Sequence, residues 1–149
     1  MNSKSKNFKS KNFRSYTLPN QPQFKKPHSS RLAFNFSFLT DSTQYNLKKN
    51  NKNVDKKIRL KLLEKIFILS QEDKVLVLGY PKAQGLESIP EDQVSLRINQ
   101  EFKDSGRYNE CEDDYWVFRL STKGRVIGKI SNNIFYILAV DPKFDLYKH

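Results

Sequence analysis

The sequence has little cysteine and histidine, with one Cys and two His among its 149 residues. A single thiol excludes an internal disulfide, and so few thiol and imidazole groups do not predict a structural zinc site. Cys111 lies among carboxylates in the segment "NECEDDY". Neighbouring negative charges raise the pKa of a thiol, so we predict no cysteine nucleophile. A chain without disulfides fits a reducing compartment, and we predict a cytoplasmic location.

Long apolar segments and cofactor motifs are also missing from the sequence. No apolar run approaches the ~20 residues that cross a bilayer, and the amino end has no apolar signal core. There is no glycine loop for a nucleotide and no serine-elbow motif. The acidic residues of segment 101–114 lack the spacing and the glycine of a calcium loop. We therefore predict no membrane partner, no metal and no small-molecule cofactor.

Basic residues are abundant by contrast, with 27 Lys and Arg against 16 Asp and Glu and a net charge of +11. This excess favours an anionic partner, such as nucleic acid, the ribosome, an acidic protein or an anionic membrane. The charge is uneven, because the first 40 residues contain basic residues and no acidic ones. We therefore divide the chain into two parts: a disordered basic tail over residues 1–29 and a single α+β domain over residues 30–149.

The predicted tail contains a near-repeat, "KNFKS" followed by "KNFRS". Aromatic rings between cations can stack on unpaired bases while the cations contact phosphates. We therefore predict that Lys9, Lys11 and Arg14 bind nucleic acid. The alternative is a solubilising tail that has no ligand.

Periodicity predicts the first elements of the domain. Alternation in "RLAFNFSFL" indicates a strand with one buried face. Apolar residues at Ile58, Leu62, Ile66 and Leu69 indicate an amphipathic helix whose buried stripe is widened by Leu63 and Phe67. Residues 74–78 fit either a second helix or a short strand, and we favour the helix. Residues 94–98 read as a strand, and segment 101–114 as an exposed acidic loop.

The last third of the chain predicts three strands, at residues 115–120, 125–130 and 134–140. The connections "STKG" and "SNN" are short and rich in turn residues, which is typical of an antiparallel meander. "NIFYILAV" is nearly all apolar and predicts a central strand covered on both faces. The order strand, one or two helices and then strands predicts an α+β fold. In it, helices cover one face of a mostly antiparallel sheet.

Alternation along these strands places Arg119 and Arg125 on one sheet surface, which we expect to face solvent. Two such cations can hold the charged phosphorane during RNA cleavage without metal, while a base and an acid move the protons. The alternative is an exposed face with ordinary salt bridges to the acidic loop.

The segment "VFRLSTKGRVIGKISNNIFYILAVDPKFDLY" resembles the RelE/YoeB-type toxin superfamily, small bacterial ribosome-dependent mRNA interferases whose relatives include ParE. Those proteins typically have an Arg on each of two late strands, an apolar third strand and a terminal Tyr or His. The corresponding residues here are Arg119, Arg125, Tyr147 and His149. The resemblance covers residues 31–149 in the order of elements and residues 115–149 in sequence. Where the family often places a basic residue after the apolar strand, Lys143 stands in a shifted position.

The resemblance implies a toxin-like, metal-independent mRNA endonuclease of a toxin–antitoxin system. Its implied partners are mRNA on the ribosome and a cognate antitoxin protein. Arg119 and Arg125 would clamp the phosphate, and Tyr147, His149 or Glu87 would handle protons. The residues expected to bind nucleic acid in the domain are Lys82, Lys129 and Lys143. The alternatives are a non-catalytic nucleic-acid-binding module and a protein-interaction module of a mobile element.

Overall fold

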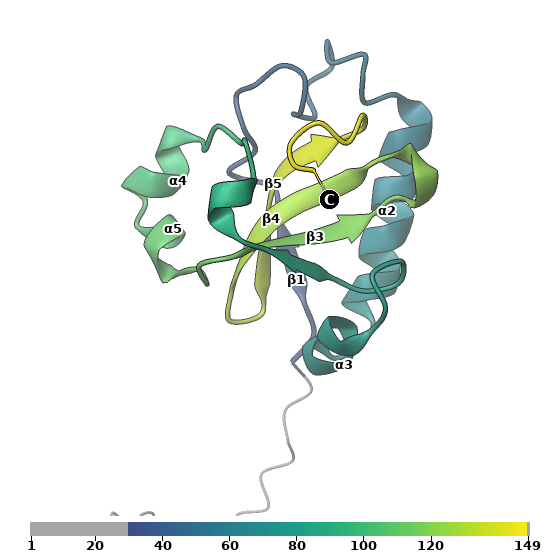
Figure 1. Cartoon of the computed structure of the whole chain (residues 1–149), viewed down its shortest axis with the longest axis vertical. Coiled ribbons are helices and arrows are strands. Elements are labelled where there is room, and N and C mark those ends of the chain that lie inside the picture. The colour runs from purple at the N-terminus through teal and green to yellow at the C-terminus, as the bar shows by residue number, and fades with distance from the viewer. Residues whose placement is uncertain (1–29, 149) are drawn as a thin grey trace, which may run out of the picture.

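A computed structural model describes residues 30–148, in which five strands form one mixed sheet in the order β1-β5-β4-β3-β2. The strands are β1 (Ala33–Asn35), β2 (Glu87–Ile89), β3 (Tyr115–Arg119), β4 (Arg125–Ser131) and β5 (Ile134–Asp141). β1 pairs with β5 in parallel, and the other neighbours are antiparallel. β3, β4 and β5 therefore form the predicted meander, and the α+β fold class is confirmed (Figure 1). The predicted tail and His149 lie outside the described residues.

Helices lie on both sides of this sheet rather than on one side, which corrects the sequence prediction. They are α2 (Lys56–Ser70), α3 (Lys74–Gly79), α4 (Gln100–Asp104) and α5 (Arg107–Glu110), with short 3-10 turns at η1 (Glu91–Gln93) and η2 (Ser121–Lys123). Figure 1 shows α2 and α3 on one side of the strands and α4 and α5 on the other. α2 begins where Asp55 accepts a hydrogen bond from the Ile58 backbone N–H at 2.9 Å, as is typical of a helix N-cap.

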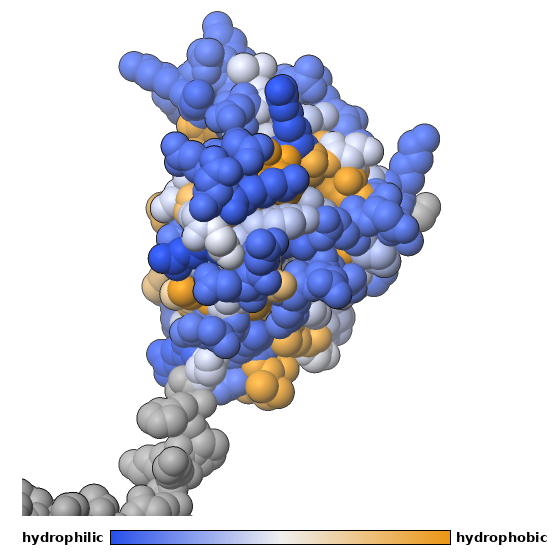
Figure 2. Space-filling model, turned by 90° about the vertical axis from the view of Figure 1, so that its left-hand side faces the viewer, coloured by the Kyte–Doolittle hydropathy of each residue, from blue (hydrophilic) through white to orange (hydrophobic). Residues whose placement is uncertain are grey.

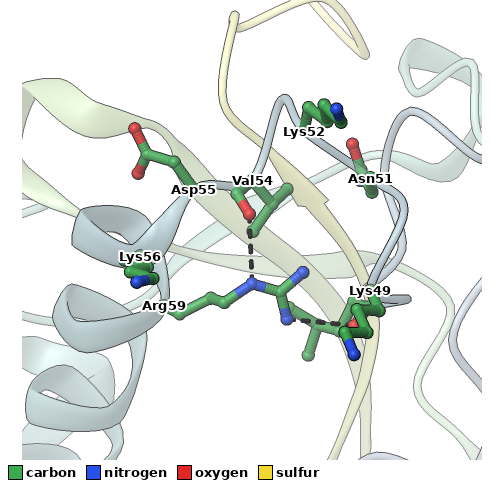
Figure 3. Close-up of a pocket in the computed structure, with 8 residues that line it drawn as sticks. Lys49, Asn51, Lys52, Val54, Asp55, Lys56 and Arg59 are labelled. Carbon is green, nitrogen blue, oxygen red and sulfur yellow. Dashed lines mark hydrogen bonds between the residues drawn. The ribbon is translucent and has the colours of Figure 1, made fainter.

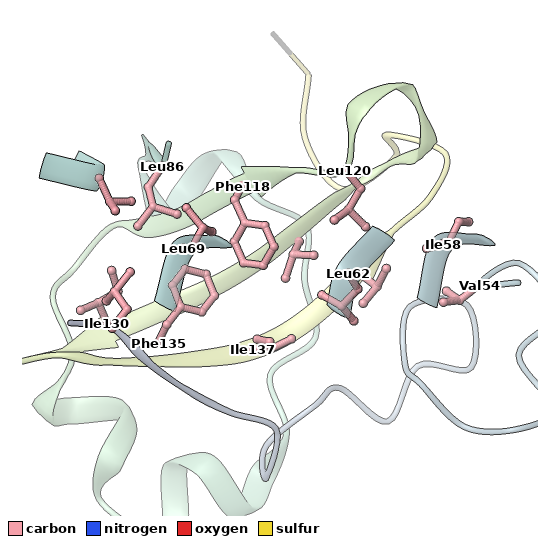
Figure 4. Packing of buried hydrophobic residues seen from close by; sticks show 14 residues of the cluster. Val54, Ile58, Leu62, Leu69, Leu86, Phe118, Leu120, Ile130, Phe135 and Ile137 are labelled. Atoms are coloured by element: carbon pink, nitrogen blue, oxygen red, sulfur yellow. The ribbon is translucent and has the colours of Figure 1, made fainter. Parts of the chain in front are cut away.

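The core beneath α2 confirms three positions of the predicted stripe. Ile58, Leu62 and Leu69 are buried against Phe118 and Ile137 of the sheet (Figure 4). β5 is covered on both faces as predicted, because its Phe135, Ile137 and Val140 join this cluster while Tyr136, Leu138 and Ala139 join a second one.

Two residues assigned to the helix stripe are not in the core. Leu63 is 65% exposed and Phe67 is 66% exposed. A helix that packs on one sheet face buries a limited arc, and the apolar arc of α2 is wider than that contact. The prediction that both residues widen the buried stripe is therefore wrong.

The second face of the sheet is covered by the segment that was expected to be an exposed acidic loop. α4 and α5 lie within it, and Phe102 of α4 is fully buried against Tyr136 and Phe38, with ring centroids 5.2 and 4.9 Å away. Residues 94–98 form no strand, but Val94, Leu96 and Ile98 pack on this cluster. Figure 2 shows this side of the molecule from outside, and most of the surface that covers this cluster is hydrophilic.

Within residues 30–148, no helix combines the length and the apolar character that crossing a membrane requires.

Candidate functional site

The register of β3 and β4 places Arg119 directly opposite Arg125. Residues paired across an antiparallel ladder share one face of the sheet, so the predicted common side of the two guanidinium groups is observed. Their surroundings differ, because the Arg119 side chain is 34% exposed and the Arg125 side chain only 1% exposed.

Arg125 does not face solvent, which corrects its predicted role as a phosphate clamp. Its Nε lies 3.0 Å from Asp141 Oδ2, and its Nη2 donates to the Tyr147 carbonyl at 2.6 Å. The guanidinium carbon lies 3.4 Å from the centroid of the Tyr147 ring. The chain that follows β5 therefore covers Arg125 and leaves it no access to a polymer.

Asp141 holds this covering segment in place. Its carboxylate accepts hydrogen bonds from the backbone N–H groups of Asp145, at 2.9 Å, and Leu146, at 3.0 Å. The β3–β4 connection passes close by, because a Cβ on Gly124 (φ +139°) would lie 2.8 Å from Pro142 Cα. Only glycine allows that approach, so the "KGRV" turn and the chain end pack tightly.

Four predicted site residues meet around the buried carboxylate of Glu87, and we call Lys82, Glu87, Arg119 and Tyr147 the Glu87 cluster. Lys82 Nζ lies 3.0 Å from Glu87 Oε2, and Arg119 Nη2 lies 3.8 Å from Glu87 Oε1. The Tyr147 hydroxyl donates to Glu87 Oε1 at 3.4 Å. Glu87 comes from β2 at the sheet edge, next to β3, and Tyr147 from the chain end.

The cluster combines an excess of positive charge with a protonated hydroxyl. Burial raises the pKa of Tyr147 above its ordinary value, although the Arg125 charge acts in the opposite direction. Tyr147 therefore keeps its proton at neutral pH and is a proton donor. Two cations surround one carboxylate, so the cluster suits an anion that approaches Arg119 and Lys82, both of which reach solvent.

A cavity of about 170 Å³ adjoins Arg119, and α2 forms its other wall through Lys61 and Lys65. Burial lowers the pKa of Lys65, whose Nζ donates to the carbonyls of Ala83, at 3.2 Å, and Gln84, at 3.4 Å. Neither lysine is among the predicted site residues. Their four-residue spacing on one helix face was the signal that could have indicated a role in the site.

The other predicted residues do not join the cluster. Lys129 is 2% exposed, and its Nζ contacts Glu91 Oε2 at 2.5 Å and the Asp113 carbonyl at 2.7 Å. The prediction that Lys129 binds nucleic acid is therefore wrong, because the lysine is enclosed. Lys143 is exposed but lines a separate cavity with Tyr45 and Asn53. His149, Lys9, Lys11 and Arg14 lie outside the described residues.

Comparisons with known proteins add no assignment: no family model, curated protein or solved structure matches the chain. In the part of the chain that the structure describes, no group of three or more His, Cys, Asp or Glu is placed to hold a metal ion. The resemblance to RelE-type toxins stays a prediction.

Proposed function

We propose that the chain is a toxin-like RNA endonuclease that cleaves mRNA at the Glu87 cluster without a metal ion. The observation that supports this proposal is the position of a buried carboxylate between two accessible cations and a protonated tyrosine. These groups are the base, the charge-stabilising donors and the acid that cleavage of RNA by its own 2′-hydroxyl requires.

In the proposed reaction, Glu87 takes the proton of the ribose 2′-hydroxyl, and the 2′-oxygen bonds to phosphorus. The bond from phosphorus to the 5′-oxygen breaks, and that oxygen takes the proton of Tyr147. The products are a 2′,3′-cyclic phosphate and a 5′-hydroxyl. Arg119 and Lys82 bind the phosphate oxygens whose charge increases in the transition state. Proton transfer from Glu87 to Tyr147, along their hydrogen bond, restores both groups.

Arg125 takes a different part in this proposal from the one the sequence suggested. It is a positioning residue, because it stacks on the Tyr147 ring at 3.4 Å and binds its backbone carbonyl. Mutation of Arg125 is therefore a poor test of catalysis, since it changes folding as well as the site.

The partners implied by the resemblance belong to the same proposal. They are mRNA on the ribosome, in the cytoplasm, and an antitoxin protein that covers the basic site. Induced expression is then expected to arrest growth.

The test uses the full chain and a labelled RNA, with chelator present. We expect Glu87→Gln to slow cleavage about 10²- to 10⁴-fold, the usual contribution of a general base. Arg119→Ala is expected to slow it about 10²-fold, as loss of one charge-stabilising donor does. Lys123→Ala removes a nearby exposed cation outside the cluster and serves as the control. Cleavage by Glu87→Gln at the rate of the unmodified chain contradicts the proposal.

A non-catalytic RNA-binding module is the second candidate, and one observation favours it. Glu87 already forms an ion pair with Lys82 at 3.0 Å, so one oxygen of the carboxylate has a partner within the protein. This candidate predicts salt-sensitive RNA binding without product, and a sharp loss of affinity with a flatter salt dependence after deletion of residues 1–29. A module that binds only protein predicts neither cleavage nor salt-sensitive RNA binding.

A further inference from the structure

A second group of cations lies around a cavity of about 540 Å³ where the loop after β1 meets α2 (Figure 3). Its basic lining residues are Lys49, Lys52, Lys56 and Arg59, and we call them the α2 basic pocket. In Figure 3, Lys49 and Lys56 lie on either side of the Arg59 guanidinium, and the Asp55 carboxylate points away from it.

The charge of this pocket is not neutralised within the described residues. None of the six ion pairs found in residues 30–148 involves these four cations. Asp55 is the single carboxylate of the described lining, and it accepts a hydrogen bond from the Ile58 backbone. The cations Lys82, Arg119, Arg125 and Lys129 all have carboxylate partners. Like charges held together without counter-charge attract an anion.

The pocket is held rigidly by backbone contacts. Arg59 donates to the carbonyls of Val54, at 3.1 Å, Leu47, at 3.0 Å, and Lys48, at 3.1 Å. A guanidinium has five N–H donors, so two remain for a ligand after these three bonds. The buried Asn51 fixes the same loop by donating to the Asn46 carbonyl at 2.8 Å. Fixed donors lose little freedom when a ligand binds.

The position of the pocket selects the class of anion. Lys56 lines the α2 basic pocket, and Lys61 and Lys65 line the cavity beside Arg119. The nine-residue step from Lys56 to Lys65 spans about 14 Å along α2 and, at 3.6 residues per turn, about half a turn around it. A ligand that contacts both cavities must therefore pass around the helix, which a single nucleotide is too short to do and a flexible single strand of several nucleotides is long enough to do. No aromatic ring lines the described part of the pocket, so contacts would be to phosphate rather than to bases.

We propose that the α2 basic pocket binds the phosphate backbone of RNA, as a docking site separate from the Glu87 cluster, with α2 connecting the two. This proposal rests on the RNA ligand of the proposed function and does not depend on cleavage.

The experiment measures RNA binding by the full chain in a Glu87→Gln background, which keeps the RNA intact under the proposed mechanism. A triple variant, Lys49→Gln with Lys52→Gln and Lys56→Gln, removes three exposed cations and retains Arg59, which holds the loop. The matched control replaces Arg97, Lys103 and Lys123, which are also exposed, by Gln and loses the same net charge elsewhere. The probe is a labelled single-stranded oligoribonucleotide, and affinity is followed against salt concentration.

If all three lysines contact phosphates, the slope of log affinity against log salt falls in magnitude by about 2, from ~0.7 per phosphate on a single strand. The control triple is expected to change the slope by less than a third of the change in the pocket triple. An equal loss in both triples, or no loss in the pocket triple, overturns the proposal. Displacement of the RNA by polyglutamate at equal charge would also overturn it, by indicating a general anion site.

The outcome for cleavage is separate. Cleavage that persists in the Glu87→Gln background rejects the proposed catalytic site. The slopes are then measured with an RNA whose 2′-hydroxyls are methylated, and they still decide the docking proposal. A matching melting temperature and circular dichroism spectrum for the two triples exclude misfolding as the cause of a changed slope.

Discussion

Replacing Arg125 by methionine should destabilise the folded protein severely. Arg125 and Asp141 are 1% and 0% exposed, and their closest atoms are 3.0 Å apart. Methionine keeps much of the side-chain volume but leaves the Asp141 carboxylate buried without its cation. Breaking a buried pair from one side costs about 3–5 kcal/mol. Total stabilities of about 5–15 kcal/mol mean that this loss is a large fraction of the whole.

The structure also predicts how the partner variants behave. Asp141→Asn keeps the shape and leaves the guanidinium buried, where Nη1 already has no hydrogen-bond partner among the described residues. We expect a cost of similar size, about 3 kcal/mol or more. The double variant Arg125→Met with Asp141→Asn removes both charges, so we expect it to be less destabilised than the sum of the single variants.

Urea unfolding followed by the fluorescence of Trp116 measures these differences. Lys143→Met is the control, since it alters an exposed cation that has no ion pair in residues 30–148 and should change stability by less than about 0.5 kcal/mol. A cost below about 1 kcal/mol for Arg125→Met would show that the guanidinium is hydrated, and the assignment of a buried charge pair would then be refuted.

Two further predictions concern the core and the pH dependence of stability. Leu62→Ala should cost about 2–5 kcal/mol because Leu62 is 4% exposed, whereas Leu63→Ala should stay within about 0.5 kcal/mol; equal costs in urea unfolding would contradict the assigned helix face. Burial raises the pKa of Glu91, but hydrogen bonds from Lys129 and Tyr108 outweigh it and lower the pKa below its ordinary value. The stabilisation from Glu91 is therefore present above the unfolded pKa of about 4.3 and lost as the pH falls through the folded pKa. The difference in the free energy of unfolding between the unmodified chain and Glu91→Gln should therefore decrease as the pH falls from about 6 to about 3. A difference that stays constant would show that ionisation of Glu91 does not stabilise the fold.

The elements that the sequence predicted well have long periodic patterns or short, specific turns. The meander follows from alternation in three strands joined by "STKG" and "SNN". The elements that the sequence did not predict are short. β2 has three residues, and its pattern in "LESIP" is too brief for any period to stand out. α4 has five residues, of which Phe102 is the one buried. The acidic residues around it therefore led to the prediction of an exposed loop.

The candidate site was predicted in part for the same reason. Alternation fixes the side of the sheet to which Arg119 points. Lys82 and Glu87 were assigned through the resemblance alone, and their place beside Arg119 comes from the structure. Alternation does not tell what covers a side chain. The misassigned residues, Arg125 and Lys129, are both enclosed by segments distant in sequence, which are the chain end for Arg125 and the turn at Glu91 for Lys129.

A single irregularity in the β4–β5 ladder explains how Arg125 acquires its partner. Near the turn the ladder pairs Ser131 with Ile134 and Ile130 with Phe135, and in an unbroken register Arg125 would face Val140. The register shifts by one residue between Ile127 and Gly128, where β5 has an additional residue, as in a β-bulge. Arg125 then faces Asp141 instead.

The consequences of that bulge extend to the Glu87 cluster. Because a one-residue shift moves later side chains to the opposite face, Asp141 reaches the face that carries Arg119 and Arg125. There it binds Arg125 and the backbone of Leu146, and so turns the chain end across the sheet. The turned chain end brings the Tyr147 hydroxyl to Glu87. In an unbroken register, Arg125 would face Val140 and would have no carboxylate opposite it. The β-bulge therefore gives Arg125 the partner that the sequence did not predict, and the same bulge leads to the contact of Tyr147 with Glu87.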